Sequence, residues 1–347
     1  MAYTTIDNGA LYFNSKIYSG TGSSNAITGI GFQPDWVWIK NKGATSSHRM
    51  VNAVSGSSEL MSTNITNVGA DSSYVSAFNS DGFTVGSAND TNQSSNDFIS
   101  WCWKCETAFT NDASATGVGS IDSSGRTNQT AGISIITYDG TGSAGTIAHN
   151  LGAVPDAIWI KRISSADNWT VGHNDLGWGG FIRLDSSASF STNTNTWNNT
   201  APTSTVFSVN HVDVNASGET FVAYIFKSIQ GYSKISRYYG NEDTSNPQLI
   251  YTGFQPAFIL IKKSTGSTDS WFLHDQLRDG YNEDNEYMRP NENTAQGSGV
   301  NRLNIFSNGF QVPTTDKSHN ADGVGYIYWA FAKHPFVSSS GIPTTAR

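Results

Sequence analysis

The chain has 347 residues, of which 37% are hydrophobic and 14% are charged, and its formal net charge is −8. A sizeable hydrophobic core can therefore form, whereas nucleic-acid binding is not expected, because phosphate contacts need clustered lysine and arginine. No apolar run approaches the roughly 18 residues of a membrane span, and two cysteines cannot form a disulfide framework.

Residues 1–16 are expected to form an N-terminal attachment arm ahead of the first folded unit. The opening sequence MAYTTIDNGALYF lacks the basic region and apolar segment of a secretory signal peptide. This predicts a protein that is made in the cytoplasm and leaves the cell by lysis.

Three stretches of the chain carry the same landmarks in the same order, which indicates internal repeats. The landmarks are a tyrosine (Tyr18, Tyr138, Tyr238), a proline six residues before a lysine (Lys40, Lys161, Lys262), a Phe-x-Val pair, and an asparagine (Asn92, Asn215, Asn320) nine residues before an aromatic-x-aromatic pair. We place β repeats at 17–109, 132–228 and 229–336. A Gly/Ser/Thr/Asn-rich linker is expected at 110–131 and a C-terminal tail at 337–347.

Short strands are predicted within each repeat. The runs WVWI, AIWI and FILI before the landmark lysines are apolar on both faces, which is typical of central buried strands. Asp81-Gly82 and Asn308-Gly309 suit tight hairpin turns. We therefore expect an all-β protein with three tandem antiparallel β-sandwich-like repeats of about 100 residues each.

The segment from Trp101 to Cys105 has the spacing of a WCxxC redox motif. A redox dithiol needs its first thiolate at a helix N-terminus, whereas this segment is predicted to be a strand. Ile225 and Ala330 stand in the other repeats where Cys102 stands in the first, so a buried apolar position is the favoured interpretation.

No metal, cofactor or catalytic residue is predicted. His48 occupies the position held by Trp169 and Trp271 in the other repeats, so the histidines are not in register as shared ligands. Acidic residues cluster once in the third repeat, at Asp275, Asp279, Glu283, Asp284 and Glu286. Such a cluster could supply the paired carboxylates of a glycoside hydrolase, but its segment has the composition of a solvated loop.

Four aromatic residues outside the shared landmarks are the candidate ligand-binding residues. Trp178, Trp197, Tyr281 and Tyr287 lie in variable polar segments, where an exposed ring can stack on a sugar while nearby amides bond its hydroxyls. The alternative is that these rings cap the ends of the sandwiches or fill a subunit interface, where aromatic residues are enriched.

Several phrases, among them GFQPDWVWIK, VAYIFKSIQGYSK, YTGFQPAFILIKK and YIYWAFAKHPF, resemble a repeat domain of unknown function. That domain recurs in virion structural proteins, often described as tail-fibre-like, of bacteriophages of marine bacteria and cyanobacteria. The resemblance covers roughly residues 1–336 and brings no established activity or catalytic residues with it.

The resemblance implies a virion structural protein, first of all a tail fibre or spike subunit that can also bind host-surface glycan. A capsid decoration or connector protein is the alternative, and a glycan depolymerase is less favoured. The implied partners are other virion proteins, contacted through the N-terminal region, and further copies of the chain in a closed homotrimer.

Overall fold

The computed structural model describes residues 3–279, 282–283 and 285–344. Antiparallel sheets dominate the described chain, and its helices are single turns of three or four residues. None of these helices has the length and apolar character needed to cross a membrane. The prediction of an all-β protein is therefore confirmed.

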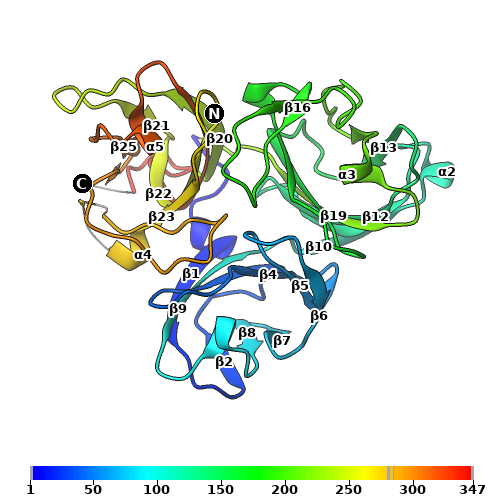
Figure 1. Cartoon of the computed structure of the whole chain (residues 1–347), viewed down its shortest axis with the longest axis horizontal. Coiled ribbons are helices and arrows are strands. Elements are labelled where there is room, and N and C mark those ends of the chain that lie inside the picture. Colours follow the sequence, from blue (N-terminus) through cyan, green and yellow to red (C-terminus); the bar gives the residue numbers. More distant parts are fainter. Residues whose placement is uncertain (1–2, 280–281, 284, 345–347) are drawn as a thin grey trace.

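Three large sheets surround a common centre, and the chain passes through them in order (Figure 1). The first sheet has the order β1 (Phe13–Ser19), β9 (Asp97–Trp103), β3 (Trp36–Asn41), β4 (Arg49–Asn52), β5 (Gly56–Met61), β6 (Val68–Ala70). The second has the order β10 (Thr107–Asn111), β11 (Ser123–Asn128), β12 (Ile133–Asp139), β19 (Thr220–Phe226), β14 (Ala157–Arg162), β15 (Thr170–His173). The third has the order β20 (Ser233–Tyr239), β26 (Gly325–Pro335), β22 (Phe254–Lys263), β23 (Trp271–Asp275).

Each large sheet is accompanied by a small outer sheet, and we call each large sheet with its small sheet and connecting loops a unit. These are β2 (Asn25–Thr28), β8 (Gly82–Val85) and β7 (Val75–Asn79); β13 (Gly145–Ala148) and β18 (Val206–Val209); and β21 (Leu249–Tyr251), β25 (Gly309–Gln311) and β24 (Asn304–Phe306). A further hairpin joins β16 (Gly180–Phe181) to β17 (Ser191–Thr192). The short helices are η1 (Gly9–Leu11), α1 (Asn89–Asn92), α2 (Ala113–Thr116), η2 (Asn174–Leu176), α3 (Val212–Asn215), α4 (Gln276–Asp279) and α5 (Lys317–Asn320).

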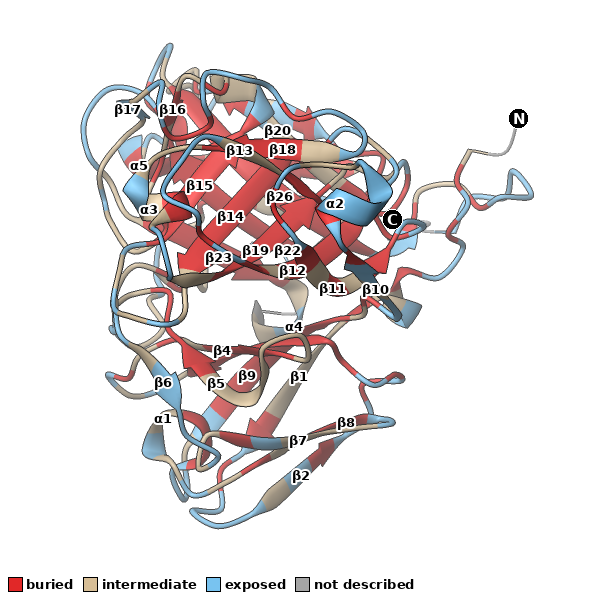
Figure 2. Ribbon diagram, turned by 90° about the vertical axis from the view of Figure 1, so that its right-hand side faces the viewer, coloured by how far each residue is buried: buried red, intermediate tan, exposed pale blue. Residues whose placement is uncertain are grey.

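Both faces of the central strands are buried, which explains why their sequences are apolar without interruption. Side chains alternate between faces along a strand, so on β3 Val37 and Ile39 pack under the first small sheet while Trp36 and Trp38 point to the centre. The second and third sheets have equivalent outer cores of their own. Figure 2 shows the large sheets as mostly buried.

The inner faces of the three large sheets meet in one shared core of aromatic side chains. Trp36 of the first sheet lies 4.9 Å from Tyr224 of the second, between ring centroids. Trp103 of the first lies 5.5 Å from Phe258 of the third, and Trp159 of the second lies 5.4 Å from Trp329 of the third. Because such rings bury about 150–250 Å² each, the sheets form a compact cluster around this core.

The landmark lysines link neighbouring sheets in a closed ring. Each is fully buried. Lys161 and Lys262 donate to one carbonyl of their own loop and Lys40 to two, and each lysine donates to one carbonyl of another sheet's loop. The inter-sheet acceptors are Asn293 for Lys40 (3.3 Å), Thr66 for Lys161 (2.7 Å) and Ser187 for Lys262 (3.0 Å). The lysine of the first sheet therefore bonds a loop of the third, that of the second bonds a loop of the first, and that of the third bonds a loop of the second.

The landmark tyrosines and asparagines also have matching roles. The hydroxyls of Tyr18, Tyr138 and Tyr238 donate to carbonyls of α1, α3 and α5 at 2.7, 2.7 and 2.8 Å. The side-chain oxygens of Asn92, Asn215 and Asn320 each accept a backbone N–H at 2.9 Å from the turn that follows β1, β12 or β20. Buried polar groups that are satisfied in this way fix the local geometry of each sheet.

The expected linker at 110–131 is structured. Strands β10 and β11 form a hairpin that extends the second sheet beyond β12. Ser123 and Thr127 on β11 are buried, and their hydroxyls donate to backbone carbonyls. Small polar residues thus form strands here because their backbone groups pair with neighbouring strands and their buried hydroxyls donate hydrogen bonds to backbone carbonyls.

The expected attachment arm at 1–16 also differs from a free arm where the structure describes it. Ile6 and Phe13 are buried in the shared core, and the hydroxyl of Thr4 donates to the Gln230 carbonyl at 2.7 Å. Ser339 of the expected C-terminal tail bonds the carboxylate of Asp7. The two ends of the chain therefore close against each other and the third sheet.

Candidate functional site

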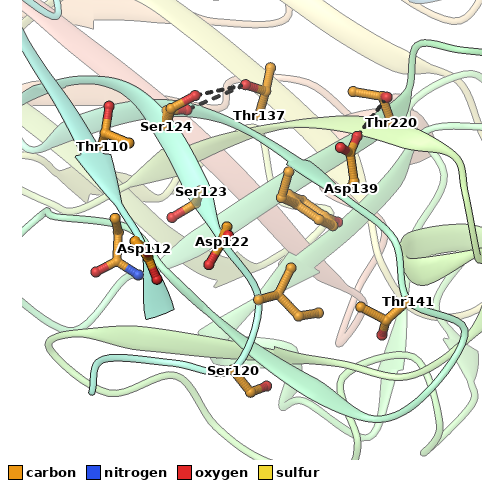
Figure 3. Close-up of a pocket in the computed structure, with 13 residues that line it drawn as sticks. Thr110, Asp112, Ser120, Asp122, Ser123, Ser124, Thr137, Asp139, Thr141 and Thr220 are labelled. Carbon is orange, nitrogen blue, oxygen red and sulfur yellow. Dashed lines mark hydrogen bonds between the residues drawn. The ribbon is translucent and has the colours of Figure 1, made fainter. Parts of the chain in front are cut away.

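A pocket of about 640 Å³ opens at the edge of the second sheet. It lies where the C-terminal ends of β10 and β12 meet the N-terminal ends of β11 and β19 (Figure 3). Its polar lining comprises the carboxylates Asp112, Asp122 and Asp139, the amide Asn111 and the hydroxyls of Thr110, Ser120, Ser123, Ser124, Thr137, Thr141 and Thr220. This hairpin edge has no counterpart in the strand order of the first and third sheets.

Local hydrogen bonds fix the segment between β10 and β11 that lines one side of the pocket. Asp112 caps α2 by accepting the Ala115 N–H at 3.0 Å, and Asp122 accepts the Ala113 N–H at 2.8 Å. The segment before β11 then runs beside β13, where the Ser120 N–H donates to the Thr146 carbonyl at 2.8 Å. The loop that leads into β11 is thereby fixed against the small sheet, while the strands and loops of the large sheet line the pocket.

The pocket is acidic and offers mainly acceptors. Hydrogen bonds from the Ser114 hydroxyl and the Ala115 amide lower the pKa of Asp112, so this carboxyl is ionised at neutral pH. Asp139, which also lines the pocket, accepts the Thr220 hydroxyl at 2.7 Å (Figure 3). Tyr138 is buried and donates to the Val214 carbonyl, so its ring is no exposed platform.

This chemistry suits a ligand that donates several hydrogen bonds. Carboxylates accept two or more hydrogen bonds, and serine and threonine hydroxyls can donate or accept. A polyhydroxylated molecule such as a saccharide meets that pattern. A cleft of this size also falls in the usual range for small-ligand pockets, about 300–1,000 Å³.

The candidate residues Trp178 and Trp197 are core residues. Their side chains are 7% and 0% exposed, their rings meet edge to face at 5.2 Å, and Trp197 donates to the Gly180 carbonyl at 2.9 Å. Their surroundings look variable and polar in sequence, but the rings fill the end of the second sandwich core. Neither ring has an exposed face to offer a sugar.

The structure places the candidate Tyr287 away from this pocket, in the third sheet's part of the chain. Tyr287 is partly buried in the third unit, with the Arg302 guanidinium 4.2 Å from its ring centroid and Phe272 at 5.4 Å. Tyr281 lies outside the described residues.

The acidic cluster at 275–286 is not a uniformly solvated loop. Asp275 is buried and forms a 2.6 Å ion pair with Arg278, whose side chain is also buried. Glu283 is exposed, and Asp284 lies outside the described residues. Burial raises the pKa of another carboxyl, Asp185, to about 6, but Asp185 does not line the pocket.

The two cysteines lie in different cores, Cys102 in the outer core of the first unit and Cys105 in the shared core. Both thiols are free and buried, and burial raises their pKa. This agrees with the structural interpretation of the segment. Across the described residues, no group of three or more metal-ligating side chains is found.

Sequence reasoning missed the pocket because one of its walls, which includes residues 110–112 and 120–124, falls in the predicted linker. The available signal was the insertion itself, since within the described residues the first and third large sheets have no strands that correspond to β10 and β11. Loops and insertions on a rigid scaffold are where binding residues collect.

The comparisons with known proteins give one family and no curated relative. A family model described as a domain of unknown function, DUF7483, matches residues 8–335. No curated protein matches the sequence. Since the match covers nearly all of the 347 residues, the chain belongs to the DUF7483 family.

Proposed function

We propose that this protein is a virion structural protein of a bacteriophage, of tail fibre or spike type. It would be made in the host cytoplasm and reach the medium within the virion on lysis. The observation that carries the proposal is the closed ring of three sheets around one aromatic core. Such a body is held by apolar packing and buried hydrogen bonds, which salt screens far less than surface charge pairs.

We also propose that the three sheets are three tandem β-sandwich-like repeats of about 100 residues. The strand orders β1-β9-β3-β4, β12-β19-β14-β15 and β20-β26-β22-β23 support this. So do the matching roles of the landmark lysines, tyrosines and asparagines. A duplication that conserved these buried polar contacts accounts for both observations.

Assembly with other copies and with other virion proteins is part of the proposal. A closed homotrimer is the expected oligomer, and the N-terminal region the expected contact with a neighbouring virion protein. Because residues 3–12 pack within the chain, that contact would use their outer surface, where Leu11 is 53% exposed. Light scattering coupled to size-exclusion chromatography tests the oligomer, and a monomer at all concentrations contradicts the trimer.

Within this proposed function, the pocket on the second sheet is the part that would recognise the host. Its carboxylates and hydroxyls can bond the hydroxyls of a surface glycan. We therefore assign glycan binding to this pocket and not to Trp178 and Trp197, which are buried.

Adsorption competition tests the function. Host cells are incubated with the purified protein, and the rate of phage adsorption is then measured. We expect dose-dependent inhibition by the wild type, weaker inhibition by Asp139→Ala, and full inhibition by the control Asp322→Ala, which removes one exposed carboxylate in the third unit.

Other outcomes would redirect the proposal. Lack of inhibition by a folded sample contradicts receptor binding and favours capsid decoration or a connector role. Release of soluble sugar from host polysaccharide would instead indicate a depolymerase.

A further inference from the structure

The outer face of the third small sheet, β21-β25-β24, carries large apolar side chains in contact with solvent. Its inner residues Ile250, Ile305 and Phe310 pack in the outer core of the third unit. On the opposite face, Leu249 is 47% exposed, Tyr251 56% and Phe306 37%. We call these last three residues, with Gln311 and Asn304, the aromatic face.

The pairing register places the two rings of this face in one row. Tyr251 pairs with Gly309, and Gly309 pairs with Phe306, so the rings flank a residue with no side chain. The next row is Leu249, Gln311 and Asn304. The two aromatic residues are two strands apart, roughly 9.6 Å at the usual spacing of strands, which is comparable to the length of a disaccharide unit.

The first small sheet shows that the fold does not need these residues. Ile27 pairs with Phe83 there as Ile250 pairs with Phe310 in the third sheet. By that register, Ala26, Thr28 and Asn79 stand where the third sheet has Leu249, Tyr251 and Phe306. Large exposed apolar residues are thus particular to the third sheet and are not required to form it.

The chemistry of the face indicates the kind of ligand. Its side chains carry no charge. Asn304 donates to the Gln311 side-chain oxygen at 3.5 Å, and Gln311 donates to the Pro247 carbonyl at 3.2 Å. Since a side-chain amide has two N–H groups, each keeps one N–H beside the rings for a ligand. Tyr251 also borders a pocket of about 340 Å³ whose lining includes Gln230, Ser233 and Thr252. Flat rings can cover the C–H face of a pyranose, while amides and hydroxyls bond its edge.

We propose that the aromatic face binds an extended, uncharged, β-linked polysaccharide. Tyr251 and Phe306 would stack on two sugar rings of one chain, and Gln311 and Asn304 would bond hydroxyls between them. The neutral face disfavours anionic polymers, which need cationic partners. This inference goes beyond the proposed function: it rests on the geometry of this face and holds for any origin of the protein.

A retention assay on microcrystalline cellulose and on chitin beads tests the proposal. We expect the wild-type chain to be retained on at least one of these solids. The variant Leu249→Ala/Tyr251→Thr/Phe306→Asn, which carries the residues of the first small sheet, should be retained at least about tenfold less. The control Tyr239→Ala removes a tyrosine that is 48% exposed on β20 and should be retained like the wild type.

A reverse graft guards against loss of fold in the triple variant. Ala26→Leu/Thr28→Tyr/Asn79→Phe/Thr84→Gln/Ala77→Asn, introduced into the triple variant, places the same five side chains on the first small sheet and should restore retention. Equal retention of wild type and a folded triple variant would overturn the proposal, as would no retention of the wild type. Self-association that the triple variant abolishes, without polysaccharide binding, would also overturn it and identify a second copy as the occupant. Adsorption competition is measured separately, so failure of either proposal is distinguishable from failure of the other.

Discussion

The ammonium group of Lys161 on β14 donates a 2.7 Å hydrogen bond to the carbonyl oxygen of Thr66, 95 residues earlier in the first unit. It also donates to the Asp167 carbonyl in its own loop. Lys40 and Lys262 make the equivalent pairs of contacts. One buried residue type therefore closes all three junctions between the sheets.

Replacing Lys161 by methionine should destabilise the protein while keeping the length of the side chain. The partly buried Asp167 carbonyl would lose its lysine donor, and the partly buried Thr66 carbonyl would keep only the Asp167 N–H at 3.3 Å. An unsatisfied buried polar group costs about 1–3 kcal/mol, so we expect the free energy of unfolding, measured by urea denaturation, to fall by about 1–3 kcal/mol. Lys333→Met, at an exposed position, is the control, and an equal effect of the two variants would contradict a role of the ring in stability.

The sequence could reveal the lysine as a landmark but not its partner. Its acceptor is a backbone carbonyl in another unit, and any residue can supply a carbonyl. The same limit applies to Trp169 and Trp271, whose indole nitrogens donate to the Ser62 and Arg183 carbonyls of neighbouring units at 2.7 and 2.8 Å. Inter-unit contacts of this kind leave no pattern at the accepting positions.

The strands of the cores were predictable because burial on both faces demands uninterrupted apolar residues. The hairpin β10–β11 was not, because its ladder is made by backbone groups and its buried positions are filled by small or polar residues such as Ser123 and Thr127. Trp178 and Trp197 were misleading for the opposite reason, since polar neighbours surround rings that are themselves buried. The pocket depends on that hairpin and so could not be located from composition.

The N-terminal segment should contribute directly to stability. Ile6 is 2% exposed in the shared core, so Ile6→Ala removes buried methyl groups and leaves a cavity. We expect a loss of about 2–4 kcal/mol in the free energy of unfolding. Leu11→Ala, at a side chain 53% exposed, should change it by less than about 0.5 kcal/mol. A wild-type unfolding curve for Ile6→Ala would show that the segment is not packed in solution.

The thiols should be inert in the native protein. Cys102 and Cys105 are 0% exposed, and burial raises the pKa of both thiols, so the reactive thiolate is scarce at neutral pH. With an aromatic disulfide reagent at pH 8, we expect both thiols to react in denaturant and neither to react quickly without it. Rapid reaction of one native thiol would instead support the redox interpretation of the motif.

Acid should destabilise the fold through histidines that are buried as neutral rings. The Nδ1 atom of His149 accepts the Leu151 N–H at 3.1 Å, and that of His173 accepts the Asp175 N–H at 3.1 Å. Protonation at Nδ1 would break these bonds. Burial lowers the pKa of both rings to about 4 from the ordinary 6.5.

The sign of the effect follows from proton binding. Between pH 6.5 and pH 4 the unfolded chain binds protons at these histidines and the folded chain does not, so the free energy of unfolding falls as the pH falls through this window. The loss should reach up to about 3 kcal/mol for each ring. His149→Gln keeps a side-chain acceptor but cannot be protonated, so its curve of unfolding free energy against pH should be shallower than that of the wild type by about one proton. Both curves, measured by urea denaturation at pH steps from 7.5 to 4, should therefore converge toward acid, and parallel curves would show that His149 is not buried in its neutral form.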